Sequence, residues 1–305
     1  MAYLLETCSL GKDIGKQKII EDVSLHVKKG EIYGFLGPNG AGKTTILKLV
    51  TGLWKPTKGE IFLFGKQMKN DFGHGLKRMG IVLEYPAFYQ FLSGRENLEL
   101  HREYMGYYRH GSVEEALKLV CLEEMADRPV KDYSLGMKER LGIARAVLCK
   151  PEFLILDEPL NGLDPSGIHQ IRELIRRLCQ EYGTTVLMSS HILSEVETTA
   201  DTVGILCKGK LKEEVSMKEL SEKSASFIEV LATDRKRAAF VLEEKLNIRK
   251  FRIMEDGHIR VYDQGIHVER MVKHLAAEEV GVLSIGRKTE TLEEYFMQLV
   301  GEDLQ

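Results

Sequence analysis

Residues 37–44 read Gly-Pro-Asn-Gly-Ala-Gly-Lys-Thr and fit the phosphate-binding pattern G-x-x-x-x-G-K-[S/T]. They follow the largely apolar run 31–36 and precede a helical pattern over residues 44–53, so the loop joins a buried strand to a helix. Glycines let backbone N–H groups approach phosphates, and the helix N-terminus favours their negative charge. A chance glycine turn would not need lysine and threonine at these two positions. The residues predicted to contact a nucleotide are Gly37, Pro38, Asn39, Gly40, Ala41, Gly42, Lys43, Thr44 and Thr45.

Two side chains at the end of this loop have separate predicted roles. Lys43 would neutralise the β- and γ-phosphates of the nucleotide, and the Thr44 hydroxyl would be a ligand of Mg²⁺. Nucleotide binding with Mg²⁺ is the expected result.

An acidic pair follows the apolar run 153–156. Asp157 and Glu158 would lie at the carboxyl end of a buried strand, where doubly wound sheets have their ligand crevices. Taken alone, such a pair is more often a solvated strand end, but the phosphate loop on the same chain favours a catalytic pair. We predict that Asp157 holds Mg²⁺, directly or through water, and that Glu158 orients and deprotonates the water that attacks the γ-phosphate.

Short apolar runs alternate with helical patterns over the first 215 residues. The runs at 153–156 and 184–188, separated by a helical pattern at 166–182, predict an α/β core with a mainly parallel sheet, as in P-loop NTPases. Between residues 86 and 150 the pattern is almost wholly helical, which predicts a helical subdomain inserted into this core.

The last 90 residues have a different pattern. Strand and helix signals follow in the order β-α-β-β-α-β, which is typical of small ferredoxin-like α+β domains, and an amphipathic helix at 292–300 comes after them. We therefore predict two domains, residues 1–215 and 216–305.

Residues 133–140, Tyr-Ser-Leu-Gly-Met-Lys-Glu-Arg, resemble the signature motif of ATP-binding cassette (ABC) proteins, with Ser134 and Gly136 retained. A helix N-terminus capped by serine offers free N–H groups and a positive dipole end to a phosphate. The resemblance implies a head-to-tail dimer in which this motif contacts the γ-phosphate of ATP bound to the other subunit.

Other motifs of the family follow in the same order, and the resemblance covers about residues 3–215. Residues 161–164 resemble the loop that crosses to the partner subunit, and His191 resembles the histidine that senses the γ-phosphate. A lone histidine after a strand is usually a polar strand end. The place of His191 downstream of the acidic pair favours the sensor role instead, so we count it among the catalytic residues. The implied cofactors are ATP and Mg²⁺, and the implied activity is ATP hydrolysis.

Leu135 and Lys138 replace family residues within the signature motif, and two positions outside it also depart from the family pattern. Glu84 replaces the usual glutamine in the loop before the helical subdomain, and its carboxylate would be a stronger Mg²⁺ ligand. With the Pro-x-Phe-Tyr sequence that follows it and the Ser-Leu-Gly-Met signature, it resembles the bacitracin-resistance and lantibiotic-immunity branch of exporter ATPases. Ile14 replaces the aromatic residue that usually stacks on adenine, so base stacking would be weaker.

Composition narrows the classes of partner. The net charge of −3 and the pI near 6.3 provide no global basic field for nucleic acid. No apolar run reaches the roughly 18 residues typical of a spanning helix, so we expect a cytoplasmic chain, peripheral at the inner face of the cell membrane. The five scattered cysteines form no metal-binding pattern.

These observations favour the ATP-hydrolysing subunit of an exporter of peptide antibiotics or similar amphipathic compounds. Its expected partners are separate transmembrane permease subunits and a second copy of the chain, without nucleic acid. The alternative is a soluble ABC ATPase that acts on ribosomes or DNA, but neither a second phosphate loop nor heptad repeats occur. The C-terminal domain would stabilise the dimer or sense a ligand.

Overall fold

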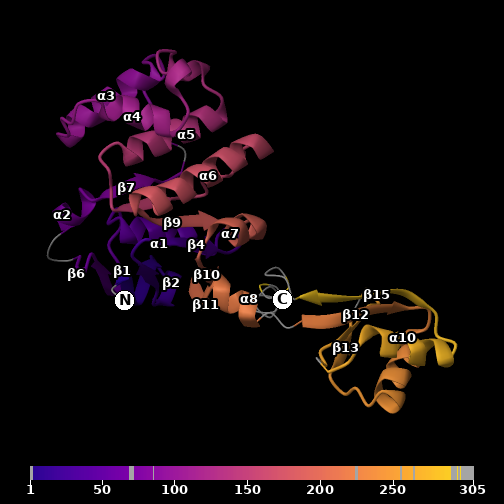
Figure 1. The fold of residues 1–305 in the computed structure, drawn as a ribbon. Coiled ribbons are helices and arrows are strands. Elements are labelled where there is room, and N and C mark those ends of the chain that lie inside the picture. Colours follow the sequence, from indigo (N-terminus) through magenta and orange to yellow (C-terminus); the bar gives the residue numbers. More distant parts are fainter. Residues whose placement is uncertain are drawn as a thin grey trace. The chain divides into compact units, whose positions relative to one another are not determined.

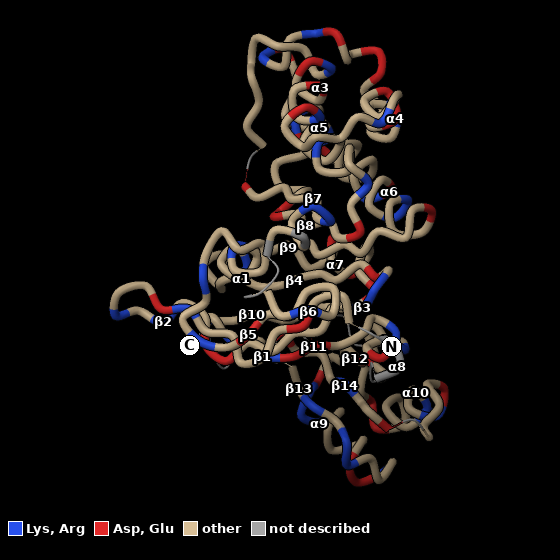
Figure 2. Tube along the Cα trace, turned by 90° about the vertical axis from the view of Figure 1, so that its left-hand side faces the viewer, with Lys and Arg blue, Asp and Glu red and all other residues tan. Residues whose placement is uncertain are grey.

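The computed structural model describes residues 3–68, 72–84, 86–223, 226–254, 256–263 and 265–289, together with residues 294 and 296. The chain divides into two compact units, Met1–Lys218 and Glu219–Gln305 (Figure 1). Each unit has its own cluster of buried apolar side chains. Basic and acidic residues are interspersed along both units (Figure 2).

A six-stranded sheet forms the centre of the first unit. Its strands lie in the order β11 (Lys210–Ser216), β10 (Thr202–Cys207), β4 (Ile32–Leu36), β9 (Thr185–Ser190), β8 (Phe153–Leu156) and β7 (Met79–Val82). All neighbouring pairs are parallel except β10 and β11. Every residue of β4, β8, β9 and β10 is buried, which is the pattern of strands covered on both faces. The predicted mainly parallel sheet is confirmed.

The loops after β4, β8 and β9 meet at one edge of this sheet, because parallel strands have their carboxyl ends together. Helix α1 (Lys43–Val50) follows β4, α6 (Pro165–Tyr182) follows β8, and α7 (Leu193–Thr199) follows β9. The site described below is built from these loops.

A second, antiparallel sheet belongs to the same unit and was not predicted. It has the order β2 (Gln17–Val23), β1 (Tyr3–Ile14), β5 (Lys58–Leu63), β6 (Lys66–Gln67), with β3 (His26–Lys28) also paired to β1. The short helix α2 (Phe72–Leu76) follows it in the chain. Its strands mix buried and exposed residues, unlike those of the central sheet.

A group of helices is inserted between β7 and β8, as predicted (Figure 1). It contains α3 (Gly94–Met105), α4 (Ser112–Leu119) and α5 (Leu135–Val147), with 3-10 turns at Glu123–Met125 and Val130–Asp132. A capping box begins α3, because Ser93 accepts a hydrogen bond from the Glu96 N–H while the Glu96 carboxylate accepts one from the Ser93 N–H. This cap fixes where the inserted helices begin.

Helix α5 packs against β7 so closely that residue 80 has no room for a side chain. A Cβ atom on Gly80 would lie 2.3 Å from the Ala146 carbonyl oxygen. We expect Gly80→Ala to lower the free energy of unfolding by about 1–3 kcal/mol, as overpacked sites do. Gly73→Ala is the matched control, because no atom lies within 4 Å of a Cβ there. Equal denaturation midpoints for the two variants would contradict this packing.

The second unit has one antiparallel sheet in the order β13 (Phe251–Ile253), β14 (Ile259–Val261), β12 (Ser226–Ala232), β15 (Val282–Thr289). Helix α9 (Arg235–Phe240) and a π-helical turn (Val241–Lys245) connect β12 to β13, and α10 (Val268–Ala277) connects β14 to β15. Helix α8 (Met217–Lys223) precedes β12. The predicted ferredoxin-like order is confirmed, whereas the helix predicted at 292–300 lies outside the described residues.

Candidate functional site

The phosphate loop lies between the buried strand β4 and helix α1, where the sequence places it. Gly42 precedes the first helical residue with φ 107° and no side-chain cap, so the first N–H groups of α1 are free for a ligand. A Cβ on Gly42 would lie 2.6 Å from Ile20 Cδ1. Both the backbone angle and the space require glycine at this position.

Lys43 turns back over its own loop. Its Nζ donates hydrogen bonds to the carbonyl oxygens of Gly37 at 2.8 Å and Pro38 at 3.4 Å. It also forms an ion pair with Glu158 Oε1 at 3.1 Å. The ammonium group is therefore held beside the loop and the acidic pair at once.

Asp157 connects the loop after β8 to α1 and to β9. Thr44 Oγ1 donates a hydrogen bond to Asp157 Oδ2 at 2.8 Å, and Ser189 Oγ donates one to Asp157 Oδ1 at 2.6 Å. The carboxylate is buried, and both of its oxygens are fixed. The two side chains predicted as Mg²⁺ ligands, Thr44 and Asp157, are thus in direct contact.

Glu158 has the backbone angle φ 51°, which is uncommon for a residue with a side chain. Its N–H donates to Ser189 Oγ at 2.9 Å, which helps to hold this conformation. Its Oε2 accepts a hydrogen bond from His191 Nδ1 at 2.6 Å. Strained backbone of this kind concentrates at functional sites, and here it places the carboxylate between Lys43 and His191.

These groups open into one cavity of about 540 Å³. Its lining residues are Ile19, Asn39, Gly40, Gly42, Lys43, Thr44, Thr45, Glu158, Asn161 and His191. Most of the loop residues, the proposed base and the histidine therefore surround one space. Four predicted site residues do not line it: Gly37, Pro38, Ala41 and Asp157.

Glu84 lies outside the cavity. Its exposed carboxylate accepts a hydrogen bond from Lys48 Nζ at 2.7 Å, and this contact lowers the pKa of Glu84. Its backbone has φ 57°. Lys48 belongs to α1, so Glu84 is tied to the helix that begins at the phosphate loop.

Ser134 and Gly136 also lie outside the cavity, at the start of α5. Ser134 is exposed, and its hydroxyl caps the helix by accepting a hydrogen bond from the Met137 N–H at 3.3 Å. A Cβ on Gly136 would be 3.6 Å from Leu163 Cδ2, so the motif lies beside residues 161–164 of the same chain. The chain does not bring its signature residues to its own phosphate loop.

Comparison with known proteins identifies this arrangement. A model of the ABC transporter family matches residues 20–161. The chain is 47% identical over 300 residues to the uncharacterized ABC transporter ATP-binding protein YcbN of Bacillus subtilis, covering 98% of each chain. The chain belongs to the ABC transporter family.

Two other relatives have names that state what they transport. The chain is 41% identical to the bacitracin transport ATP-binding protein BcrA of Bacillus licheniformis, over 99% of this chain and 98% of that one. It is 42% identical to the lantibiotic transport ATP-binding protein SrtF of Streptococcus pyogenes, over 68% of this chain and 89% of that one. The dimeric ATP-binding cassette MJ0796 bound to ADP and Pi matches with a TM-score of 0.62 and 26% identity, over 70% of this chain and 98% of that one.

The resemblance drawn from the motifs, including the bacitracin and lantibiotic branch, is confirmed by these relatives. Within the described residues, no helix of this ABC family member is long and apolar enough to cross a membrane.

The oxygen donors of Thr44 and Asp157 suit Mg²⁺ better than a metal ion whose ligands all come from the protein. Within the described part of the chain, no group of three or more histidine, cysteine or acidic residues is placed to hold a metal ion. A hydroxyl and one carboxylate, Thr44 and Asp157, are the partial oxygen set of a magnesium ion that keeps waters and binds substrate phosphates. They would hold the ion against the nucleotide.

Sequence reasoning missed two contributors to this site. Ser189 contacts both Asp157 and Glu158, and its only signal was a polar residue at the end of a buried strand. Ile19 lines the cavity, whereas Ile14, at the position where the family places an aromatic residue, is half exposed and does not.

Glu139 on the signature helix α5 gives a pH-dependent prediction. Burial raises the pKa of Glu139 from 4.5 to about 7. Because the folded state binds this proton more tightly, the free energy of unfolding falls as pH rises from about 4.5 to 7, by about 1.4 kcal/mol for each pH unit between the two pKa values. The Glu139→Gln variant lacks this pH-dependent loss of stability. Its free energy of unfolding, relative to that of the wild type, should therefore increase as pH rises from about 4.5 to 7. Identical pH profiles in denaturant titrations would exclude this effect.

Proposed function

We propose that this chain binds ATP with Mg²⁺ in the phosphate-loop cavity and hydrolyses it to power a membrane transporter. The observation that carries the proposal is the position of Glu158. Its two carboxylate oxygens contact Lys43 at 3.1 Å and His191 at 2.6 Å, on the wall of the cavity that the phosphate loop opens into. A fixed carboxylate beside a phosphate site can serve as a general base.

Each group has one task in this proposal. Lys43 and the free N–H groups of α1 bind the phosphates. The Glu158 carboxylate accepts a proton from a water molecule as the water oxygen attacks the γ-phosphorus, and the bond to the β-phosphate oxygen breaks. His191 holds the carboxylate and faces the γ-phosphate. Thr44 and Asp157 would hold Mg²⁺, which would neutralise charge on the phosphates, and we propose Glu84 as a further ligand.

A second copy of the chain would complete the site. Ser134 and Gly136 begin α5 outside the chain's own cavity, and Ser134 is exposed. We propose that they contact the γ-phosphate of ATP bound to the other protomer of a homodimer. The dimeric form of the MJ0796 cassette supports this arrangement.

The transported compound is inferred from relatives. BcrA is named for bacitracin transport and SrtF for lantibiotic transport. We propose that this chain powers export of a peptide antibiotic or a similar amphipathic compound. It would act at the inner face of the cell membrane, on permease subunits that are separate polypeptides.

Affinity capture tests the coupling to a permease. A tagged Glu158→Gln chain is incubated with ATP and Mg²⁺ in detergent-solubilised native membranes, and the co-purifying proteins are identified by mass. A polytopic membrane protein in stoichiometric yield is expected. Recovery of ribosomes, DNA or only soluble proteins would overturn the transporter proposal and favour a soluble ABC ATPase.

A further inference from the structure

The turn that carries His191 is fixed by a buried serine. Ser190 is the last residue of β9, and its side chain is buried, whereas His191 beside it is exposed. The Ser190 Oγ accepts a hydrogen bond from the Ile192 N–H at 2.9 Å. When a serine hydroxyl accepts from the N–H two residues later, it closes a turn over the residue between them. That residue is His191, so the hydroxyl fixes its backbone from both sides.

Glu195, in the first turn of α7, sets the orientation of this hydroxyl. Its Oε2 accepts a hydrogen bond from Ser190 Oγ at 2.6 Å, and both side chains are buried. The Ile192 carbonyl oxygen is the competing acceptor, but it lies farther from Ser190 Oγ, at 3.3 Å. A hydroxyl has one hydrogen and two lone pairs. With the hydrogen directed at the carboxylate, a lone pair of Ser190 Oγ is left to accept from the Ile192 N–H.

The Glu195 carboxylate is stabilised by this hydrogen bond. Burial raises the pKa of Glu195, and the negative charge of Glu158 raises it further. The hydrogen bond from Ser190 has the opposite effect on this pKa, as do His191 and Arg172. A buried carboxylate costs free energy unless it is hydrogen-bonded. Ser190 and Glu195 therefore hold each other in place beneath the exposed histidine.

The place of His191 matters because its side chain meets the proposed base. His191 Nδ1 lies 2.6 Å from Glu158 Oε2, and both residues line the phosphate-loop cavity. His191 itself lies between β9 and α7, outside both elements, and its side chain is partly exposed. Packing around the ring is therefore limited, and the turn of the backbone decides where the imidazole lies.

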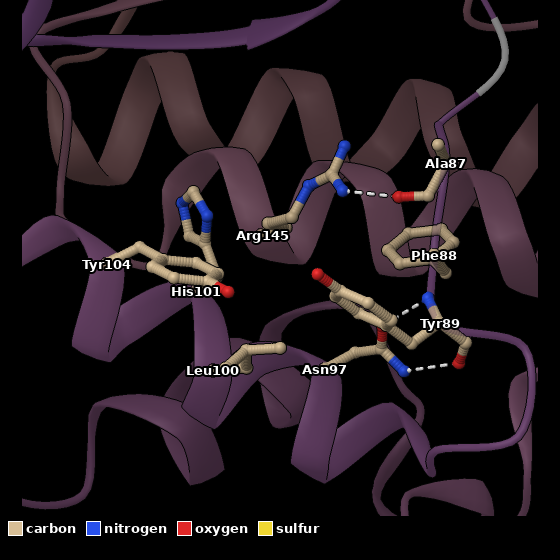
Figure 3. Close-up of a pocket in the computed structure, with 8 residues that line it drawn as sticks. All are labelled: Ala87, Phe88, Tyr89, Asn97, Leu100, His101, Tyr104 and Arg145. Atoms are coloured by element: carbon tan, nitrogen blue, oxygen red, sulfur yellow. Dashed lines mark hydrogen bonds between the residues drawn. The ribbon is translucent and has the colours of Figure 1, made fainter.

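A buried polar side chain fixes another loop of the same unit by a similar device. In α3, the Asn97 side chain accepts a hydrogen bond from the Tyr89 N–H at 2.9 Å and donates one to the Tyr89 carbonyl at 3.1 Å (Figure 3). That loop lines a separate cavity of about 340 Å³, whose lining residues all differ from those of the phosphate-loop cavity. The loop that Ser190 holds differs in its function, because it carries His191.

We propose that Glu195 is a positioning residue for ATP hydrolysis, because it holds the Ser190 hydroxyl that fixes the turn of His191. Glu195 does not line the phosphate-loop cavity. It acts through Ser190 on the place of the imidazole, and the imidazole in turn contacts Glu158. This inference rests on the proposed function, because it explains how the histidine of that site is kept facing the γ-phosphate.

Removal of either partner should slow hydrolysis without weakening nucleotide binding. Ser190→Ala and Glu195→Ala should each lower kcat roughly 10- to 100-fold, since a misplacement of about 1 Å can have an effect of that size. The affinity for ATP should stay unchanged, because the phosphate loop and Lys43 are intact. Glu195→Gln keeps an acceptor oxygen for the hydroxyl, so its kcat should stay within about threefold of the wild type. Phosphate release and calorimetric titration of ATP with Mg²⁺ measure the two quantities.

Thr202→Val is the matched control. Thr202 Oγ1 donates a hydrogen bond to Glu31 Oε2 at 2.9 Å, so this pair also joins a buried hydroxyl to a buried carboxylate. Thr202 begins β10 and Glu31 immediately precedes β4, so the pair lies at the amino ends of these strands, opposite the phosphate loop. The kcat of this variant should match that of the wild type. Thermal melts check that all variants are folded.

Double variants decide whether Glu195 acts through His191. In a His191→Ala background, Ser190→Ala or Glu195→Ala should lower kcat no further, since no imidazole is left to position. A further loss in that background, wild-type kcat in both single variants, or a loss in Glu195→Gln as large as in Glu195→Ala would overturn the positioning role alone. Wild-type turnover in His191→Ala would instead overturn the role of His191 in the proposed function, and this inference with it.

Discussion

Glu158→Gln is expected to bind ATP and to hydrolyse it roughly 10²- to 10⁴-fold more slowly, the contribution of a positioned base. The amide has nearly the size of the carboxylate, but it cannot accept a proton from the attacking water. The phosphate loop and Lys43 are unchanged, so the affinity for ATP should be kept. Phosphate release under saturating ATP, together with calorimetric titration of ATP with Mg²⁺, measures both quantities.

Glu152→Gln is the matched control for this prediction. Glu152 immediately precedes β8, whereas Glu158 follows the other end of that strand. The Glu152 carboxylate forms an exposed ion pair with Arg78. Its turnover should match the wild type, because exposed ion pairs contribute little. Turnover within tenfold of the wild type in Glu158→Gln would exclude Glu158 as the base.

The local part of the site could be predicted from the sequence. The phosphate loop, Lys43 and Thr44 lie on one strand-loop-helix segment, so their relative positions depend on few long-range contacts. The acidic pair was predictable for a similar reason, because a short apolar run fixes where β8 ends. Thr44 and Asp157 then meet because β4 and β8 flank the same neighbour, β9.

Contacts between strands were harder to predict. Ser189 reaches Asp157 and Glu158 because β8 and β9 pair in a register that sets Leu156 opposite Met188. A one-residue slip would have turned Ser189 away from the acidic pair. Hydrophobic patterning of two fully buried strands carries no signal for that register, so Ser189 was missed.

The antiparallel sheet was missed for a related reason. Strand β1 pairs with β2 nearby, but also with β5 more than 40 residues later, with register shifts in both pairings. These irregularities break the period-two alternation that identifies strands. By contrast, helical spacing over residues 137–148 predicts core positions for Met137, Leu141, Ile143 and Leu148, and all of them except the partly exposed Met137 are buried.

Lys43→Ala is expected to weaken ATP binding by roughly 10- to 100-fold, since hydrogen bonds to charged groups contribute about 1.5–3 kcal/mol. Lys43 lies 3.1 Å from Glu158 and is its ion-pair partner. Without the ammonium group, the γ-phosphate would meet the Glu158 carboxylate with no compensating charge between them. The loss of ATP affinity should therefore have two causes. The phosphates lose the attraction of the Lys43 ammonium group, and the repulsion from the Glu158 carboxylate is no longer compensated.

A double variant separates these two effects. In Lys43→Ala/Glu158→Gln the repelling carboxylate is gone, so part of the lost affinity should return, although the phosphates still lack their lysine. Lys29→Ala is the matched control, because Lys29 is exposed in the turn before β4, at the opposite end of that strand from the phosphate loop. Calorimetric titration of ATP with Mg²⁺ measures the dissociation constants of all variants. A wild-type affinity in Lys43→Ala would show that the loop N–H groups bind the phosphates alone, and an unchanged loss in the double variant would exclude the repulsion from Glu158.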